Sequence, residues 1–235
     1  MSDHLKRLAV PKSWPIKKKA HVWTTKQSAG AHAIENSMPA LTVLRDLLGI
    51  CDTAKEAKRI IGNREVLVDG KPLRSYKTPV GLMDVLTIPK MDESYRMVLS
   101  SKGKLTLVKV DKAEADWKLC RIENKTVVAG GKIQLNLHDG RNILLDKNEY
   151  KTGDVLKVSF DGQKILESYP LAAGSSALVS RGVHAGKIAK VKDYVVVKGP
   201  SANVVKFDDE SETVKGNVFV IGLNEPAIKL PEAEN

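Results

Sequence analysis

The chain has 235 residues, with 38 Lys or Arg against 28 Asp or Glu and a formal net charge of +10 at pH 7. It is 42% apolar, yet it contains no run of about eighteen apolar residues and no apolar core typical of a signal peptide. These values exclude a helical membrane protein and predict a soluble, intracellular chain with several small domains, whose excess cations favour a polyanionic partner.

Residues 1–36 form a predicted basic extension. Its first 34 residues hold seven Lys or Arg and a single acid, so more than half of the net charge lies here. Without apolar periodicity this extension cannot bury much surface by itself, and we predict a mobile arm that becomes ordered on phosphates, with Trp14 and Trp23 stacking on unpaired bases. The alternatives are a solvating tail and a membrane-surface segment; Pro11 and Pro15 obstruct the amphipathic helix that the latter needs.

Two short helices are predicted at the start of the next domain, residues 37–90. In the first, of about three turns, leucines recur at helical spacing between Pro39 and Gly49, a residue type that ends helices in the left-handed conformation. The second begins with a capping box formed by Thr53 and Glu56 and ends at Gly62-Asn63. Its apolar residues share one face, and the opposite face carries the cations Lys55, Lys58 and Arg59.

A strand hairpin is predicted after the helices. Val66 and Val68 alternate with their neighbours, and Asp69-Gly70 is typical of a tight turn in which both central residues have positive φ. Pro72 interrupts the return strand, and residues 84–88 supply a further strand. By composition alone, a solvated charged helix beside an ordinary hairpin is the preferred description of this segment.

This pattern resembles a known family. The chain resembles the small αL RNA-binding fold of ribosomal proteins and some RNA-modifying enzymes. The residues that carry the resemblance are Leu44 to Leu48, Gly49, Ala57, Ile60-Ile61, Val66, Val68-Asp69-Gly70-Lys71 and Pro79 to Val85. Within that fold the chain is most similar to the archaeal and eukaryotic family of small-subunit ribosomal protein four, written with a final e. The start, His4 to Trp14, resembles the same family. Many members of the wider fold begin the second helix with Ser-Arg. This chain has Thr53-Ala54 at that position, so its first basic contact is expected at Lys55.

Strand patterns separated by turn dipeptides dominate the central domain, predicted at residues 91–172. Between residues 91 and 170, fourteen Lys or Arg stand against twelve acids, so the surface is near-balanced and a spacing role is expected. The even spacing of the strands favours a mostly antiparallel barrel or sandwich. The turn at residues 137–143 resembles a stretch of the family's central domain, in which His138 and Arg141 reach phosphate; a plain hairpin is the alternative.

The last domain, residues 173–235, resembles the KOW motif of ribosomal proteins and transcription elongation factors. Val179, Gly182, Gly186, Ile188 and Val191 carry the resemblance, which implies a strand, a glycine-bearing loop and a strand in an SH3-like barrel. Ala189 stands where many members have a further glycine. Arg181, His184 and Lys187, which lie in or beside this loop, are predicted to contact RNA. The alternative is that the loop is only a turn.

The sequence contains no zinc-protease motif, no phosphate-cradling Gly-Lys-Ser/Thr loop and no cysteine pair at metal spacing, so we predict no catalytic residue, no metal and no cofactor. Cys51 and Cys120 are expected as buried thiols rather than a disulfide. Asp84 follows Gly81 in a strand-entry turn and is assigned a structural role.

The combined prediction is an α+β, multi-domain, non-enzymatic protein that binds and stabilises folded ribosomal RNA in the cytoplasmic small subunit. Its partners are small-subunit ribosomal RNA and neighbouring ribosomal proteins, with no membrane and no obligate homo-oligomer. An RNA-modifying enzyme and a KOW-type elongation factor are the alternatives; the first needs a catalytic α/β domain and the second a polymerase-binding domain. The residues predicted to contact RNA are Lys6, Arg7, Lys12, Trp14, Lys17, Lys18, Lys19, Arg45, Lys55, Lys58, Arg59, Arg64, Lys71, Arg74, Lys77, His138, Arg141, Arg181, His184 and Lys187.

Overall fold

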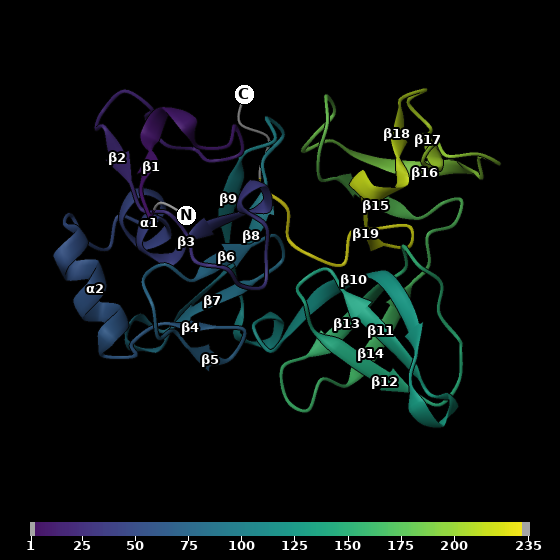
Figure 1. The fold of residues 1–235 in the computed structure, drawn as a ribbon, viewed down its shortest axis with the longest axis horizontal. Coiled ribbons are helices and arrows are strands. Elements are labelled where there is room, and N and C mark those ends of the chain that lie inside the picture. Colours follow the sequence, from purple (N-terminus) through teal and green to yellow (C-terminus); the bar gives the residue numbers. More distant parts are fainter. Residues whose placement is uncertain (1–2, 232–235) are drawn as a thin grey trace. The chain divides into compact units, whose positions relative to one another are not determined.

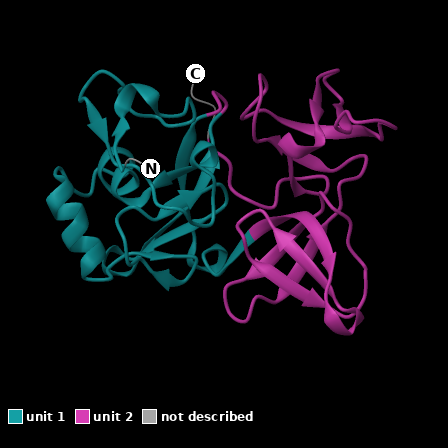
Figure 2. Cartoon of the chain, viewed as in Figure 1, with its two compact units in different colours: residues 1–100, 104–118 teal, residues 101–103, 119–235 magenta. Residues whose placement is uncertain are grey.

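The computed structural model describes residues 3–231 of the chain (Figure 1). The chain divides into two compact units, residues 1–100 with 104–118 (unit 1) and residues 101–103 with 119–235 (unit 2) (Figure 2). Both consist mainly of antiparallel strands, and the α-helices lie in unit 1. Within the described residues, no helix combines the length and apolar character needed to cross a bilayer.

Unit 1 combines a helical segment with three small sheets. Helix α1 (Ala40–Thr42) continues directly into a π-helical turn over Val43–Leu47, and α2 (Ala54–Gly62) follows. The sheets have the orders β5-β4-β7-β8-β9, β3-β6 and β1-β2. The strands are β1 (Leu5–Lys6), β2 (Trp23–Thr24), β3 (Ser37–Pro39), β4 (Leu67–Val68), β5 (Lys71–Pro72), β6 (Pro79–Gly81), β7 (Val85–Ile88), β8 (Glu93–Leu99) and β9 (Leu105–Val110).

The first helix is shorter than predicted. It covers residues 40–47 rather than about three full turns, because the ladder widens to a π turn in which the Leu48 N–H bonds to Val43 O at 3.0 Å. Gly49 then takes a φ of +64° and ends the helix, as predicted. Leu41 and Leu44 are buried, so the apolar face was correctly identified.

The second helix has the predicted boundaries and cap. The Glu56 N–H donates to Thr53 Oγ1 at 3.3 Å, and the Thr53 N–H donates to Glu56 Oε2 at 3.3 Å, which completes the capping box. The helix ends at Gly62 with Asn63 as its C-cap. The Asp69-Gly70 turn that follows has φ values of 51° and 75°, as its hairpin pattern predicted.

The domain boundary predicted after residue 90 falls within a β-hairpin of unit 1. β8 continues the sheet of β7, with Ile88 paired to Glu93, and β9 completes its edge, so the sheet runs through that position. The connection is a tight turn in which Asp92 has a φ of 55°. The Pro-Lys-Met-Asp sequence closes this hairpin.

The prediction of a mobile arm is also wrong for the described residues. Trp14 is only 2% exposed, and its indole N–H donates to Ile34 O at 3.3 Å. The Leu105 N–H donates to Ser13 O at 2.8 Å, which ties the arm to the start of β9. These contacts hold the extended arm against the core of unit 1. The arm has no periodic apolar pattern, which is the signal from which buried helices and strands are predicted.

A group of buried charges crosses the core of unit 1. Lys118 is 1% exposed, and its Nζ lies 2.6 Å from Asp69 Oδ2 and 2.9 Å from Asp84 Oδ1. His32 Nε2 contacts Asp84 Oδ1 at 3.0 Å, and the Val85 N–H donates to Asp69 Oδ1 at 3.0 Å. The group thereby joins the arm, the hairpin turn, the strand-entry turn and the end of the unit.

The structural role predicted for Asp84 is confirmed. Its Oδ2 accepts the Gly81 N–H at 2.9 Å, which closes the strand-entry turn. Gly81 packs so closely on the His32 ring that an added Cβ would lie 2.3 Å from it. The arm and the turn therefore fit each other at this position.

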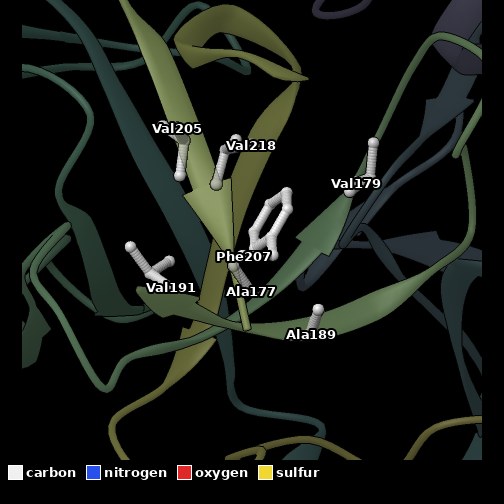
Figure 3. Packing of buried hydrophobic residues seen from close by; sticks show 7 residues of the cluster. All are labelled: Ala177, Val179, Ala189, Val191, Val205, Phe207 and Val218. Carbon is white, nitrogen blue, oxygen red and sulfur yellow. The ribbon is translucent and has the colours of Figure 1, made fainter. Parts of the chain in front are cut away.

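Unit 2 contains two five-stranded antiparallel sheets, of orders β12-β11-β10-β13-β14 and β18-β17-β16-β15-β19. In the first, Cys120, Ile122, Leu156 and Val158 belong to a buried apolar cluster. In the second, apolar side chains from several strands gather near the Phe207 ring (Figure 3). The strands are β10 (Trp117–Val127), β11 (Ile133–Leu137), β12 (Asn142–Leu145), β13 (Val155–Ser159), β14 (Ile165–Tyr169), β15 (Ser176–Val179), β16 (Ile188–Val195), β17 (Val204–Phe207), β18 (Glu212–Val214) and β19 (Val218–Gly222).

Both cysteines are buried free thiols, as predicted. Burial raises the pKa of the Cys51 thiol, and the neighbouring Glu56 carboxylate raises it further. A thiol with a raised pKa is a poor nucleophile at neutral pH, so Cys51 serves packing rather than chemistry.

Candidate RNA-binding surface

Helix α2 separates apolar and basic residues as its sequence predicted. Ala57 and Ile61 are buried toward the rest of unit 1, while Lys55, Lys58 and Arg59 are exposed. Figure 1 shows α2 at the edge of unit 1. The three cations therefore face solvent on a helix that is capped at its N-terminus, which keeps them in a fixed relative arrangement.

Further predicted cations surround this helix. Arg64, Lys71 and Arg74 are exposed, in the connection after α2 and around β5. Arg45 is half-buried, and its guanidinium pairs with Asp46 at 2.9 Å. Lys77 is half-buried, with its Nζ 5.9 Å from the centroid of the Tyr76 ring.

The arm contributes exposed cations and two predicted residues that the structure removes from the surface. Lys6, Lys12, Lys17 and Lys19 are exposed, and Lys18 is half-buried with its Nζ donating to Val10 O at 3.2 Å. Arg7 and Trp14 are buried, so neither belongs to the exposed surface of the arm, and their contact with RNA stays a prediction. The physical reason is local packing: Arg7 Nε donates to Lys17 O at 2.6 Å, and the Trp14 ring fills the core.

A basic cleft of about 320 Å³ lies between the arm and the helices. The arm supplies Trp23, Thr24, Thr25 and Lys26; the remaining lining residues are Asp3, Leu41, Arg45, Ala54, Lys58, Tyr76 and Lys77. The Lys58 Nζ lies over the Tyr76 ring, 4.5 Å from its centroid. Stacking on Trp23 was predicted, but Thr24, Lys26 and Tyr76 were not predicted as contacts, because their convergence with α2 depends on how the arm folds back.

The turn between β11 and β12 is a hairpin whose polar side chains have protein partners. The Arg121 N–H donates to His138 Nδ1 at 3.2 Å, and the His138 ring meets Phe219 edge-on, with 5.2 Å between ring centroids. Arg141 Nε pairs with Asp139 Oδ2 at 3.1 Å. The plain-hairpin alternative thus accounts for the geometry of His138 and Arg141.

Cys120, His138 and Asp139 also converge, with one possible ligand atom from each residue within 4.8 Å of the others. Cys120 Sγ lies 3.7 Å from Asp139 Oδ2. The Asp139 carboxylate pairs with Arg141, and the His138 ring accepts the Arg121 N–H. These possible metal ligands therefore already interact with other groups of the protein.

The loop between β15 and β16 has the glycine geometry that its sequence predicted. Gly182 and Gly186 have φ values of 94° and 88°, a region that favours glycine. Arg181 and His184 are exposed in the loop. Lys187 is half-buried and pairs with Asp209 at 2.9 Å.

Comparison with protein families gives three matches along the chain. Residues 1–35 match the RS4NT domain, residues 41–86 match the S4 domain, and residues 91–165 match the ribosomal family S4e. The S4 match spans the helix pair and the hairpin, the part of unit 1 that carries the exposed cations of α2.

Full-length relatives and a solved structure agree with these matches. The small ribosomal subunit protein eS4 of Methanothermobacter thermautotrophicus is 46% identical, over 97% of this chain and 96% of the relative. The protein of the same name from Methanosphaera stadtmanae is 43% identical, over 97% and 95%. The crystal structure of 30S ribosomal protein S4e from Thermoplasma acidophilum has a TM-score of 0.70 and 37% identity, covering 80% of this chain and 95% of that chain. The chain belongs to the S4e family of ribosomal proteins.

Proposed function

We propose that this protein is a non-enzymatic structural component of the small ribosomal subunit that binds and stabilises folded ribosomal RNA in the cytoplasm. One observation carries the proposal: the segment matching the S4 domain is the helix pair and hairpin whose outward face bears Lys55, Lys58 and Arg59. The relatives named as small ribosomal subunit proteins extend over nearly the whole chain.

The contact surface of unit 1 is electrostatic. Its proposed members are the exposed or half-buried cations of the arm, the helix pair and the hairpin: Lys6, Lys12, Lys17, Lys18, Lys19, Arg45, Lys55, Lys58, Arg59, Arg64, Lys71, Arg74 and Lys77. Phosphate contacts of this kind release counterions and fix the position of a protein on RNA without reading its sequence. The surface therefore suits a folded RNA whose backbone presents phosphates at several angles.

In unit 2, we propose that the domain from residue 173 onward contains a KOW-type SH3-like barrel that presents Arg181, His184 and Lys187 to RNA. The strand, glycine loop and strand at β15 and β16 support this assignment. The last four residues of the predicted C-terminal tail, 232–235, lie outside the described residues. His138 and Arg141 are secondary candidates, because both are partly exposed despite their protein partners. The near-balanced charge of residues 91–170 favours contacts with neighbouring ribosomal proteins.

The direct test is co-sedimentation. The tagged protein, expressed in an archaeal host, should migrate with small subunits in a sucrose gradient at magnesium concentrations that preserve them. A protein that stays at the top of the gradient under those conditions contradicts the proposal.

Binding to small-subunit RNA is expected to weaken steeply with salt. The slope of log K against log salt should grow by about 0.7 to 0.9 for each phosphate contact, because each contact releases counterions. A filter-binding titration from low to physiological salt measures the slope. A slope near zero would show that cationic contacts do not dominate.

Reversing two charges on α2 should separate binding from folding. Lys58→Glu together with Arg59→Glu is expected to lower RNA affinity at least tenfold, since it removes two phosphate partners and adds repulsion. The melting temperature should stay close to that of the wild type, because both side chains are exposed. Lys190→Glu with Lys192→Glu, two exposed lysines of β16, makes the same change in net charge and is the matched control. Equal losses for both double variants would indicate a nonspecific charge effect.

A further inference from the structure

The cleft between the arm and α2 has the charge of an anion site. Its lining contains four cations, Lys26, Arg45, Lys58 and Lys77, and one carboxylate, that of Asp3. Asp3 is exposed and lies 3.9 Å from the Lys77 Nζ, a long and weak pairing. Cations that converge on a concavity raise the local concentration of anions more than the same cations spread over a surface.

The cleft also offers an aromatic ring with open area. Trp23 is 53% exposed and meets the His4 ring at a tilt of 58°, with 5.5 Å between centroids, so its faces are not fully covered. Tyr76, by contrast, carries the Lys58 Nζ over its ring at 4.5 Å. Trp23 thus offers the surface for a flat ligand, and Tyr76 orients the Lys58 ammonium, which also lines the cleft.

A third observation concerns Thr24, next to Trp23 in β2. Its Oγ1 is buried and has no hydrogen-bond partner among the described residues, although the residue lines the cleft. A buried hydroxyl without a partner is destabilising, because it has given up its hydrogen bonds to water. A ligand that gives this oxygen a donor or an acceptor removes that cost, and a base edge or a ribose hydroxyl supplies either.

We propose that this cleft binds one unpaired nucleotide of RNA, with the base stacked on Trp23 and the phosphate held by Arg45 and Lys58. The inference rests on the proposed function and adds to it a site that recognises RNA shape. A volume of about 320 Å³ is at the lower end of ligand pockets and suits one nucleotide rather than a strand. Bases inside a duplex have both faces covered, so only a splayed-out nucleotide meets Trp23.

The test compares a fully paired hairpin RNA with four bulged hairpins, each of which adds a single bulged nucleotide carrying one of the four bases. The wild-type protein should bind the bulged hairpins about tenfold more tightly, the scale expected for stacking one base on an aromatic ring. Trp23→Ala should remove this preference and leave affinity for the paired hairpin nearly unchanged. Trp23→Phe should keep most of the preference, because it retains a ring.

Lys58 and Lys55 provide a matched pair on one helix. Both are exposed lysines of α2, but only Lys58 lines the cleft. Lys58→Ala should lower affinity for the bulged hairpins more than for the paired hairpin, whereas Lys55→Ala should lower both equally. Melting temperatures of all variants, measured alongside, should match the wild type.

Two results would overturn the assignment: equal affinity of the wild type for bulged and paired hairpins, or a bulge preference that survives Trp23→Ala. Either is compatible with salt-dependent binding and with co-sedimentation on small subunits, so the proposed function would stand. Loss of both of those properties in the wild type would instead contradict the proposed function itself.

Discussion

Replacing Lys118 by methionine is expected to lower the free energy of unfolding by about 3 to 5 kcal/mol, the cost of breaking a buried ion pair from one side. The substitution preserves most of the side-chain volume but leaves the carboxylates of Asp69 and Asp84 buried without their ammonium partner, which now lies 2.6 and 2.9 Å away. Urea denaturation followed by circular dichroism measures the change.

The pH dependence of this loss identifies its cause. Burial by itself would raise the pKa of Asp84, but the charge of Lys118 and the bond from His32 outweigh burial and hold that pKa below its ordinary value. In the wild type, the stabilisation from Asp84 is therefore present above its unfolded pKa, about 3.9, and is lost only as pH falls through the lower folded value. Without Lys118 the carboxylates accept protons more readily, and protonation removes their buried charge.

The stability difference between Lys118→Met and the wild type should accordingly be largest at pH 7 and narrow toward pH 4. A difference of the same size at both pH values would mean that lost packing, not unpaired carboxylates, destabilises the variant. Lys109→Met is the control: its ammonium pairs with Glu93 at 2.6 Å on the surface, and its removal should leave stability almost unchanged.

Trp14→Ala is expected to lower the free energy of unfolding by about 3 to 5 kcal/mol, because it empties a ring-sized volume in the core of unit 1. It also removes the indole donor to Ile34 O. Thermal and urea denaturation should both report the loss, and amide exchange in the RNA-free wild type should show protection at Leu105, whose N–H bonds to Ser13 O.

Trp23→Ala is the matched control for Trp14→Ala, since both residues belong to the arm but Trp23 is half exposed. It should leave stability close to the wild type. Equal effects of the two substitutions, or rapid exchange throughout residues 5–26 of the free protein, would restore the mobile arm and contradict the packing described for it.

Local patterns predicted local structure well. The capping box at Thr53, the positive φ at Asp69-Gly70 and the end of the helix at Gly49 depend on hydrogen bonds and backbone preferences within a few residues, and all three are present. The amphipathic face of α2 follows from 3.6-residue periodicity for the same reason.

Features that depend on long-range contacts were missed. Trp14 is buried by an extended segment, for which no periodicity exists, and its partner Ile34 lies 20 residues away. Lys118 meets Asp69 across 49 residues, so nothing near either residue signals the pair. The tight turn at Asp92 lies beside the domain boundary predicted after residue 90, because a short turn and a domain boundary share the same residue types.

The residues of the candidate site also differ in whether local patterns or long-range contacts determine their position. Exposed cations of α2 followed directly from helical spacing, whereas the cleft required knowledge of where β2 lies. The high net charge of the arm led to the prediction that it becomes ordered only on RNA. Its seven cations do not prevent an extended segment from packing, because Val10 and Trp14 are buried.

The position of Lys118 at the end of unit 1 has a consequence for synthesis on the ribosome. About 100 residues separate Trp14 from Lys118, so roughly 5 to 20 s of elongation pass between them at typical rates. The nascent arm lacks its partner in β9 until Leu105 is added, and Asp69 and Asp84, once synthesised, lack their cation until Lys118 is added. A cationic, incompletely packed nascent segment is thus exposed to the RNA-rich surroundings of the translating ribosome, where early capture by RNA or by a chaperone would compete with folding.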